Sequence, residues 1–86
     1  MARSAFTGQY ERFRELITEA RKKAGLTQVQ LAQKLSRPQS FVSKYELGER
    51  RLDVVEFVEV STALGIRPET FIKNFRNQRT QTRSGS

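Results

Sequence analysis

The feature that most constrains the fold is a linker of two residues, Ser36-Arg37, between two short segments with helical signals. The first segment opens with the capping box Thr27 and Gln30, in which each side chain bonds the backbone N–H of the other residue. In the second segment, Pro38 suits the first position of a helix, where no N–H is needed. The linker is too short for a long antiparallel hairpin. The sequence therefore predicts two helices that cross steeply, as in a helix-turn-helix.

Helical spacing continues on both sides of this pair. Apolar residues recur every three or four positions between 10 and 24, and Gly25 is placed to end that helix in a left-handed cap. A second capping box, Asp53 and Glu56, opens a fourth helix, and Pro68 opens a short fifth helix. We therefore predict an all-α fold. It comprises a flexible N-terminal arm over 1–8, a five-helix domain over 9–75, and a basic, disordered tail over 76–86.

Composition excludes several classes of function. The chain contains no Cys and no His, so we expect neither a disulfide nor a metal site. Its serines have no His or Cys partner, and no Gly-rich phosphate loop is present, so we expect no enzyme, no cofactor and no small-molecule effector. The apolar runs are too short for a membrane span or a signal peptide. We therefore expect a cytoplasmic, nucleoid-associated protein.

The net charge of +7 favours an anionic partner, and this charge is unevenly distributed along the chain. Segments 1–24, 25–51 and 70–86 are basic, whereas segment 52–69 holds four acidic residues and a single basic one, Arg67. A basic segment taken alone is more often a solvated helix face than a binding surface. If the chain does bind DNA, we expect the acidic segment to face away from it.

The second helix of the pair divides into two faces at 100° per residue. Val42 and Tyr45 fall on the inner face, while the outer face is short, polar and free of acids. The major groove of DNA accepts such a surface, because Gln, Lys and Ser can all bond base edges there. Phe41 either packs on the edge of the core or meets a thymine methyl. The outer side chains are Gln39, Ser40, Ser43 and Lys44.

The segment from Leu26 to Leu64, LTQVQLAQKLSRPQSFVSKYELGERRLDVVEFVEVSTAL, resembles the Xre or Cro/repressor-type (lambda-repressor-like) helix-turn-helix family. The motif consists of the opening LTQ..LA, the stretch QS.VS..E.G in the next helix and the closing ALGI. The resemblance covers residues 9–75 and implies a compact five-helix domain that binds double-stranded DNA and regulates transcription. One departure is Ser36, because this turn position is usually Gly.

The resemblance also implies roles for individual residues. The base-contacting residues that it implies are Gln39, Ser40 and Lys44, with Ser43 and Arg37 at the margins. It implies that Gln28 holds a phosphate and braces the recognition helix, and that Arg21 and Glu46 form a structural ion pair. Arg50 and Arg51 come directly after the recognition helix, where a DNA backbone would pass or where they are simply solvated. The expected phosphate contacts are Gln28, Arg37, Arg50 and Arg51.

A single recognition helix covers only a few base pairs, so we expect a homodimer on an inverted-repeat operator with half-sites about 34 Å apart. The dimer contact is expected on the fifth helix, where Phe71, Ile72 and Phe75 exceed what a short terminal helix needs for docking. Such a protein is a repressor or a controller of transcription. The alternative is an antitoxin or adaptor-type module, in which the same fold docks a protein partner such as a toxin.

Overall fold

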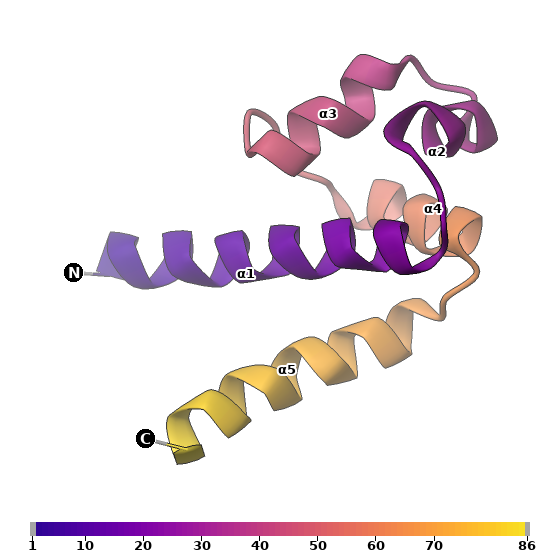
Figure 1. The fold of residues 1–86 in the computed structure, drawn as a ribbon. Helices are drawn as coiled ribbons and strands as arrows, with labels where there is room; N and C mark the ends of the chain where they lie inside the picture. Colours follow the sequence, from indigo (N-terminus) through magenta and orange to yellow (C-terminus); the bar gives the residue numbers. More distant parts are fainter. Residues whose placement is uncertain (1, 86) are drawn as a thin grey trace.

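The helices of this chain lie on two sides of its first helix. The computed structural model describes the backbone of residues 2–85 and the side chains of residues 8–77, and this part of the chain contains helices and no strand. Figure 1 shows α2 and α3 on one side of α1 and α5 on the other, with α4 packed behind α1. The helices are α1 (Ala2–Lys23), α2 (Gln28–Leu35), α3 (Gln39–Leu47), α4 (Val54–Leu64) and α5 (Pro68–Gly85).

Both predicted capping boxes are confirmed. The Thr27 hydroxyl accepts from the backbone N–H of Gln30 at 3.1 Å, and the Gln30 side chain accepts from the N–H of Thr27 at 2.9 Å. At the start of α4, Asp53 and Glu56 make the same reciprocal pair at 2.7 and 3.0 Å. These bonds satisfy backbone donors that have no partner within the helix, and so they fix where α2 and α4 begin.

The turn between α2 and α3 depends on a strained residue. Ser36 caps α2 in the left-handed conformation, with φ 57° and ψ 42°, and its N–H donates to the last turn of that helix. The N–H of Arg37 donates to the carbonyl of Ala32 at 3.0 Å, which completes the cap. Pro38 is the N-cap of α3 and does not occupy its first helical position, so α3 starts one residue later than the sequence indicated. The turn therefore keeps the left-handed geometry with Ser36 in place of the usual Gly, at a conformational cost that Gly avoids.

The two terminal helices are longer than the sequence indicated. Helix α1 begins at Ala2 and α5 ends at Gly85. Neither the predicted arm nor the predicted tail contains a Pro, so nothing in their backbone forbids this continuation. The side chains of residues 1–7 and 78–86 lie outside the described residues, and the division into arm, domain and tail stays a prediction. Although α1 and α5 are long, no helix in the described part of the chain is both long and apolar enough to cross a membrane.

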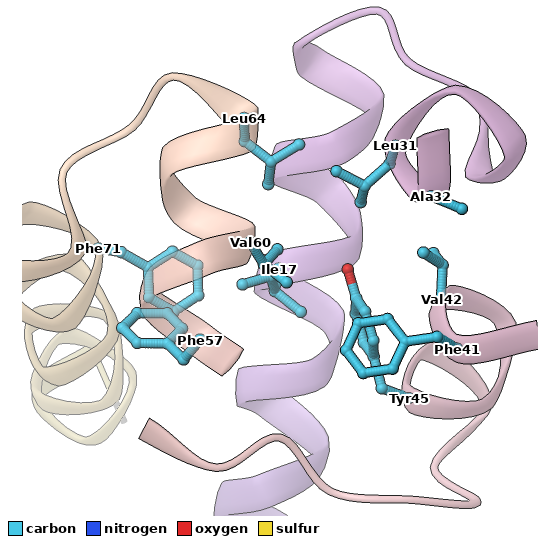
Figure 2. Packing of buried hydrophobic residues seen from close by; sticks show 10 residues of the cluster. All are labelled: Ile17, Leu31, Ala32, Phe41, Val42, Tyr45, Phe57, Val60, Leu64 and Phe71. Atoms are coloured by element: carbon cyan, nitrogen blue, oxygen red, sulfur yellow. The ribbon is translucent and has the colours of Figure 1, made fainter. Parts of the chain in front are cut away.

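The core joins all five helices and fixes the orientation of α3. In Figure 2, Ile17 of α1 and Val60 of α4 lie at its centre, and both are fully buried. Phe57 and Phe71 bring α4 and α5 together, with ring centroids 5.3 Å apart. Helix α3 contributes one buried face to this core and therefore presents its opposite face to solvent. The buried residues of that helix are Phe41, Val42 and Tyr45.

Candidate nucleic-acid interface

The outer face of α3 is an exposed polar surface, as the helical periodicity predicted. Gln39, Ser40 and Lys44 are exposed, and Ser43 is half-buried, with its hydroxyl 3.5 Å from the carbonyl of Ser40. None of these side chains is acidic, and the buried Phe41, Val42 and Tyr45 hold the helix from the other side. The structure thus brings the four expected base-contacting residues onto one helix, above a rigid support.

A buried ion pair locks the end of α3 to α1. The Nε and Nη2 atoms of Arg21 donate to the two carboxylate oxygens of Glu46 at 2.7 and 3.1 Å. Both side chains are largely buried, with exposed fractions of 10% for Arg21 and 6% for Glu46. The third donor of Arg21, Nη1, reaches the carbonyl of Leu26 at 2.8 Å, just before α2. The expected brace therefore joins α1 to α3 and to the start of the helix-turn-helix.

The same carboxylate extends this network to the exposed face of α3. The side-chain amide of Gln28 donates to Oε1 of Glu46 at 2.9 Å, and its carbonyl oxygen accepts from the amide of Gln39 at 3.2 Å. The result is a continuous chain of hydrogen bonds, Arg21–Glu46–Gln28–Gln39, that runs from the interior to the exposed start of α3. We call this chain the relay. Gln28 braces the recognition helix in this structure, as the resemblance implied, while its contact with a phosphate stays a prediction.

Arg14 is a supporting residue that sequence analysis missed. Its Nη1 donates to the carbonyl of Glu46 at 2.9 Å, at the end of α3. Its side chain also lies against Gly48, where an added Cβ would stand 3.2 Å from the guanidinium, at a backbone φ of 86°. Gly48 therefore provides both the left-handed cap and the space for Arg14. No local pattern could reveal this contact, because Arg14 and Glu46 are 32 residues apart.

The buried hydroxyl of Tyr45 has no hydrogen-bond partner among the described residues. Figure 2 shows this oxygen pointing from α3 toward α1. Burial, reinforced by the nearby Glu46 carboxylate, raises the pKa of Tyr45 far above its ordinary value of 10. Tyr45 therefore stays neutral and acts as a core residue of the recognition helix.

Phe41 is a core residue as well, which decides between the two alternatives left open by the sequence. Its side chain is 7% exposed, and its outer side is covered by two guanidinium groups. The Arg37 Cζ lies 4.4 Å from the ring centroid and the Arg50 Cζ lies 4.9 Å from it. Such cation–π contacts place the ring out of reach of a thymine methyl in this conformation. Phe41 thus supports the two arginines that flank α3.

Those two arginines also contact acidic residues of α4. Arg50 forms two bonds of 3.0 Å with the carboxylate of Glu56. Arg37 lies 3.3 Å from a carboxylate oxygen of Glu59 and 4.0 Å from one of Glu56. The acidic segment 52–69 was expected to face away from a DNA surface, but two of its carboxylates contact the arginines beside the recognition helix. We call Arg37, Phe41, Arg50, Glu56 and Glu59 the arginine–acid cluster.

Arg51 lies apart from this cluster. It is exposed, and its guanidinium stacks 4.3 Å above the ring of Tyr10 in α1. The Tyr10 hydroxyl in turn accepts from the backbone N–H of Leu52 at 3.1 Å. Of the expected phosphate-contacting arginines, Arg51 is thus tied to α1, whereas Arg37 and Arg50 are tied to α4.

The ion pair of Glu56 predicts a dependence of stability on pH. The hydrogen bonds from Arg50, followed by the bond from the backbone of Asp53, lower the pKa of Glu56 below its ordinary value of 4.5. A carboxyl with a lowered pKa in the fold contributes stability that is complete above its unfolded pKa and is lost as pH falls through the folded value. We expect Glu56→Gln to lower the unfolding free energy at neutral pH, and the difference from wild type to shrink below about pH 4.5.

Denaturant unfolding between about pH 3 and 7 measures this difference directly. Glu69→Gln is the matched control, because Glu69 is highly exposed and pairs only loosely with Arg67, at 3.4 Å. If the wild-type and Glu56→Gln proteins differ in unfolding free energy by the same amount at every pH in this range, the ionised Glu56 carboxylate is not the stabilising group.

The expected dimer residues fall into different environments. Phe71 is 7% exposed and packs against Phe13 and Phe57, so it belongs to the core of the single chain. Phe75 is half-buried near Phe13, while Ile72 is 41% exposed. Ile72 and Phe75 line an open groove of about 490 Å³ between α1, α5 and the start of α4. Other residues of this groove include Tyr10, Leu52 and Val54.

Comparisons with known proteins agree with this architecture. The profile of the family described as "Helix-turn-helix" matches residues 17–71. Among solved structures, the chain is similar to an XRE-family like protein from Pseudomonas syringae pv. tomato str. DC3000, with a TM-score of 0.85 and 40% sequence identity. The match covers 90% of this chain and 94% of that one. A search of curated proteins finds no match.

Proposed function

The chain belongs to the XRE-type helix-turn-helix family of DNA-binding transcription regulators, and we propose that it binds a specific operator as a homodimer, with α3 in the major groove. In this proposal Gln39, Ser40 and Lys44 contact base edges, with Ser43 beside them. Gln28 and the arginines around α3 contact phosphates. The bound dimer acts as a repressor or controller, in the cytoplasm at the nucleoid, by occupying DNA that transcription requires.

The observation that carries this proposal is the relay that ends at Gln39. The outer face of α3 is exposed and acid-free, yet Gln39 is held through Gln28 and Glu46 to the buried Arg21. A polar side chain that serves only for solubility needs no such support. A side chain that must meet a base edge benefits from being held in place before binding, because less freedom is lost in the complex.

Selection of bound duplexes from a random pool tests the proposal most directly. The expected result is an inverted repeat whose half-sites are centred about one helical turn apart. On that sequence, log K is expected to fall linearly with log[salt], with a slope near −5 for about six phosphate contacts. A protein that enriches no sequence, or whose duplex binding ignores salt, would not be a sequence-specific DNA regulator.

The dimer contact is proposed at the apolar groove beside α5. Val54 and Ile72 are 77% and 41% exposed, and both line this groove. A two-fold contact brings the same patch of both chains together, so these two exposed side chains would be buried against their counterparts. This surface includes Ile72 and Phe75 of the expected trio on α5, whereas Phe71 is buried in the core.

We expect Ile72→Glu to convert the dimer into a monomer at micromolar concentration, because it places a charge in the apolar contact. Sedimentation analysis measures the mass, and the affinity for the full inverted repeat is expected to fall with it. Thr70→Glu is the matched control, since Thr70 is exposed on α5 but lines a different groove, toward α1. If Ile72→Glu stays dimeric, the contact lies elsewhere on the chain.

A second candidate function, an antitoxin or adaptor, is favoured by the same apolar groove if a different protein occupies it. In that case the isolated chain is a monomer, and a partner such as a toxin buries Val54 and Ile72. The sedimentation experiment separates the two candidates, because a chain that is already monomeric before substitution leaves this groove free for a different protein.

A further inference from the structure

The two arginines of the arginine–acid cluster are held with unequal strength. Arg50 makes a two-pronged pair, with both terminal nitrogens 3.0 Å from the carboxylate of Glu56. Arg37 makes a single bond of 3.3 Å to Glu59 and lies 4.0 Å from Glu56. Two parallel bonds fix a guanidinium far better than a single long one. Arg50 is thus the fixed member of the cluster, and Arg37 is the loosely held one.

The carboxylate of Glu56 is likewise held more firmly than that of Glu59. The Glu56 side chain is 12% exposed and also accepts from the backbone N–H of Asp53 at 3.0 Å, so its position is set by the capping box of α4. The Glu59 side chain is 50% exposed. An ion pair between exposed groups contributes little, because water and salt screen it. The Arg37–Glu59 pair can therefore open at a small cost, whereas opening the two-bonded Arg50–Glu56 pair costs more.

Arg37, the more weakly held arginine, lies next to the start of α3. Arg37 directly precedes Pro38, the N-cap of α3, and its guanidinium lies over Phe41 in the first turn of that helix. When α3 enters a major groove, its first residues meet base edges, and Arg37, which precedes them on the turn, comes to the phosphate-lined margin of the groove. A phosphate arriving there meets an arginine whose charge is already neutralised by a weakly held carboxylate.

We propose that Glu59 is an affinity-setting residue, which competes with DNA phosphate for Arg37. This proposal rests on the proposed DNA binding. In the free protein Arg37 pairs with Glu59; in the complex it exchanges that carboxylate for a phosphate oxygen while Phe41 remains beneath it. Arg50 keeps its pair with Glu56 in both states, so its proposed phosphate contact does not require that pair to open. The effect is independent of base sequence, because phosphate contacts carry no sequence information.

Neutralising Glu59 tests the proposal. Glu59→Gln is expected to tighten binding to operator and to random duplex by about two- to fivefold at low salt, the range of an exposed ion pair. The slope of log K against log[salt] is expected to become steeper by up to about 0.9, which corresponds to one more phosphate contact. The control is Glu69→Gln, which removes the same charge from an exposed pair at the start of α5, on the opposite side of α1 from α3 (Figure 1).

A double-mutant cycle with Arg37→Gln identifies the partner. In the Arg37→Gln background, Glu59→Gln is expected to give no gain, because the arginine that it releases is absent. If Glu59→Gln and Glu69→Gln change affinity equally, or if the gain persists without Arg37, the competition does not exist, although the DNA binding proposed above stands. If the wild-type protein binds no duplex at all, the proposed function fails and this inference fails with it.

Discussion

Arg21→Met is expected to lower the free energy of unfolding by about 3–5 kcal/mol, because it leaves the buried carboxylate of Glu46 without its cation. Glu46 is 6% exposed, so water cannot replace the two bonds that Arg21 donates to it. Small domains of this kind have a total stability of about 5–15 kcal/mol. The substitution therefore removes a large part of the stability, and thermal or denaturant unfolding measures the loss.

Two further variants show whether the loss comes from the unpaired charge. Lys22→Met changes the neighbouring, exposed residue in the same way and is expected to alter stability by less than about 0.5 kcal/mol. Arg21→Met combined with Glu46→Leu removes both charges, and most of the stability is expected to return. That double variant also removes the anchor of Gln28, so it is expected to fold but to bind the operator weakly. A loss below about 1 kcal/mol for Arg21→Met alone would show that the pair is not a structural brace.

Lys44→Ala is expected to weaken operator binding by about 1–3 kcal/mol and to relax the base preference at one position of each half-site. Lys44 is exposed on the outer face of α3, so its removal leaves the fold intact and acts on binding alone. A lysine can donate to the acceptor atoms of guanine in the major groove, which gives it this discriminating role. Competition binding with single-base variants of the operator measures both effects.

The comparison for Lys44 is Arg51→Ala, on the loop after α3. Arg51 is proposed to contact phosphate, so its removal is expected to weaken operator and random DNA alike and to reduce the salt slope by about 1. If Lys44→Ala produces this uniform loss, Lys44 contacts the backbone and the base-contacting set is reduced to Gln39, Ser40 and Ser43.

The parts of the fold that could be predicted from sequence are those determined by near neighbours. The capping boxes at Thr27 and Asp53 bind residues three positions away, and the buried face of α3 follows from helical periodicity alone. The Arg21–Glu46 pair, 25 residues apart, could be named only because the chain resembles a family in which such a pair occurs.

The remaining contacts depend on how the helices pack against each other. Nothing near Glu59 indicates that it meets Arg37, 22 residues away on another element. Three large apolar residues on a short helix predict a dimer surface that includes Phe71. In the structure the Phe71 ring packs against Phe13 and Phe57, so docking α5 to the core uses this residue. Helical spacing shows which residues share a face, but it does not show how much of that face is covered.

The bond between Gln28 and Gln39 has a consequence for which base Gln39 suits. A glutamine amide has two N–H groups and one carbonyl oxygen with two lone pairs. Because one N–H of Gln39 is directed to Gln28, its second N–H and its carbonyl oxygen are the groups left for a base. That donor and acceptor are the complement of N7 and the N6 amino group of adenine. The bond to Gln28 restrains this amide before DNA arrives, so in the proposed complex Gln39 would lose less freedom on meeting an adenine.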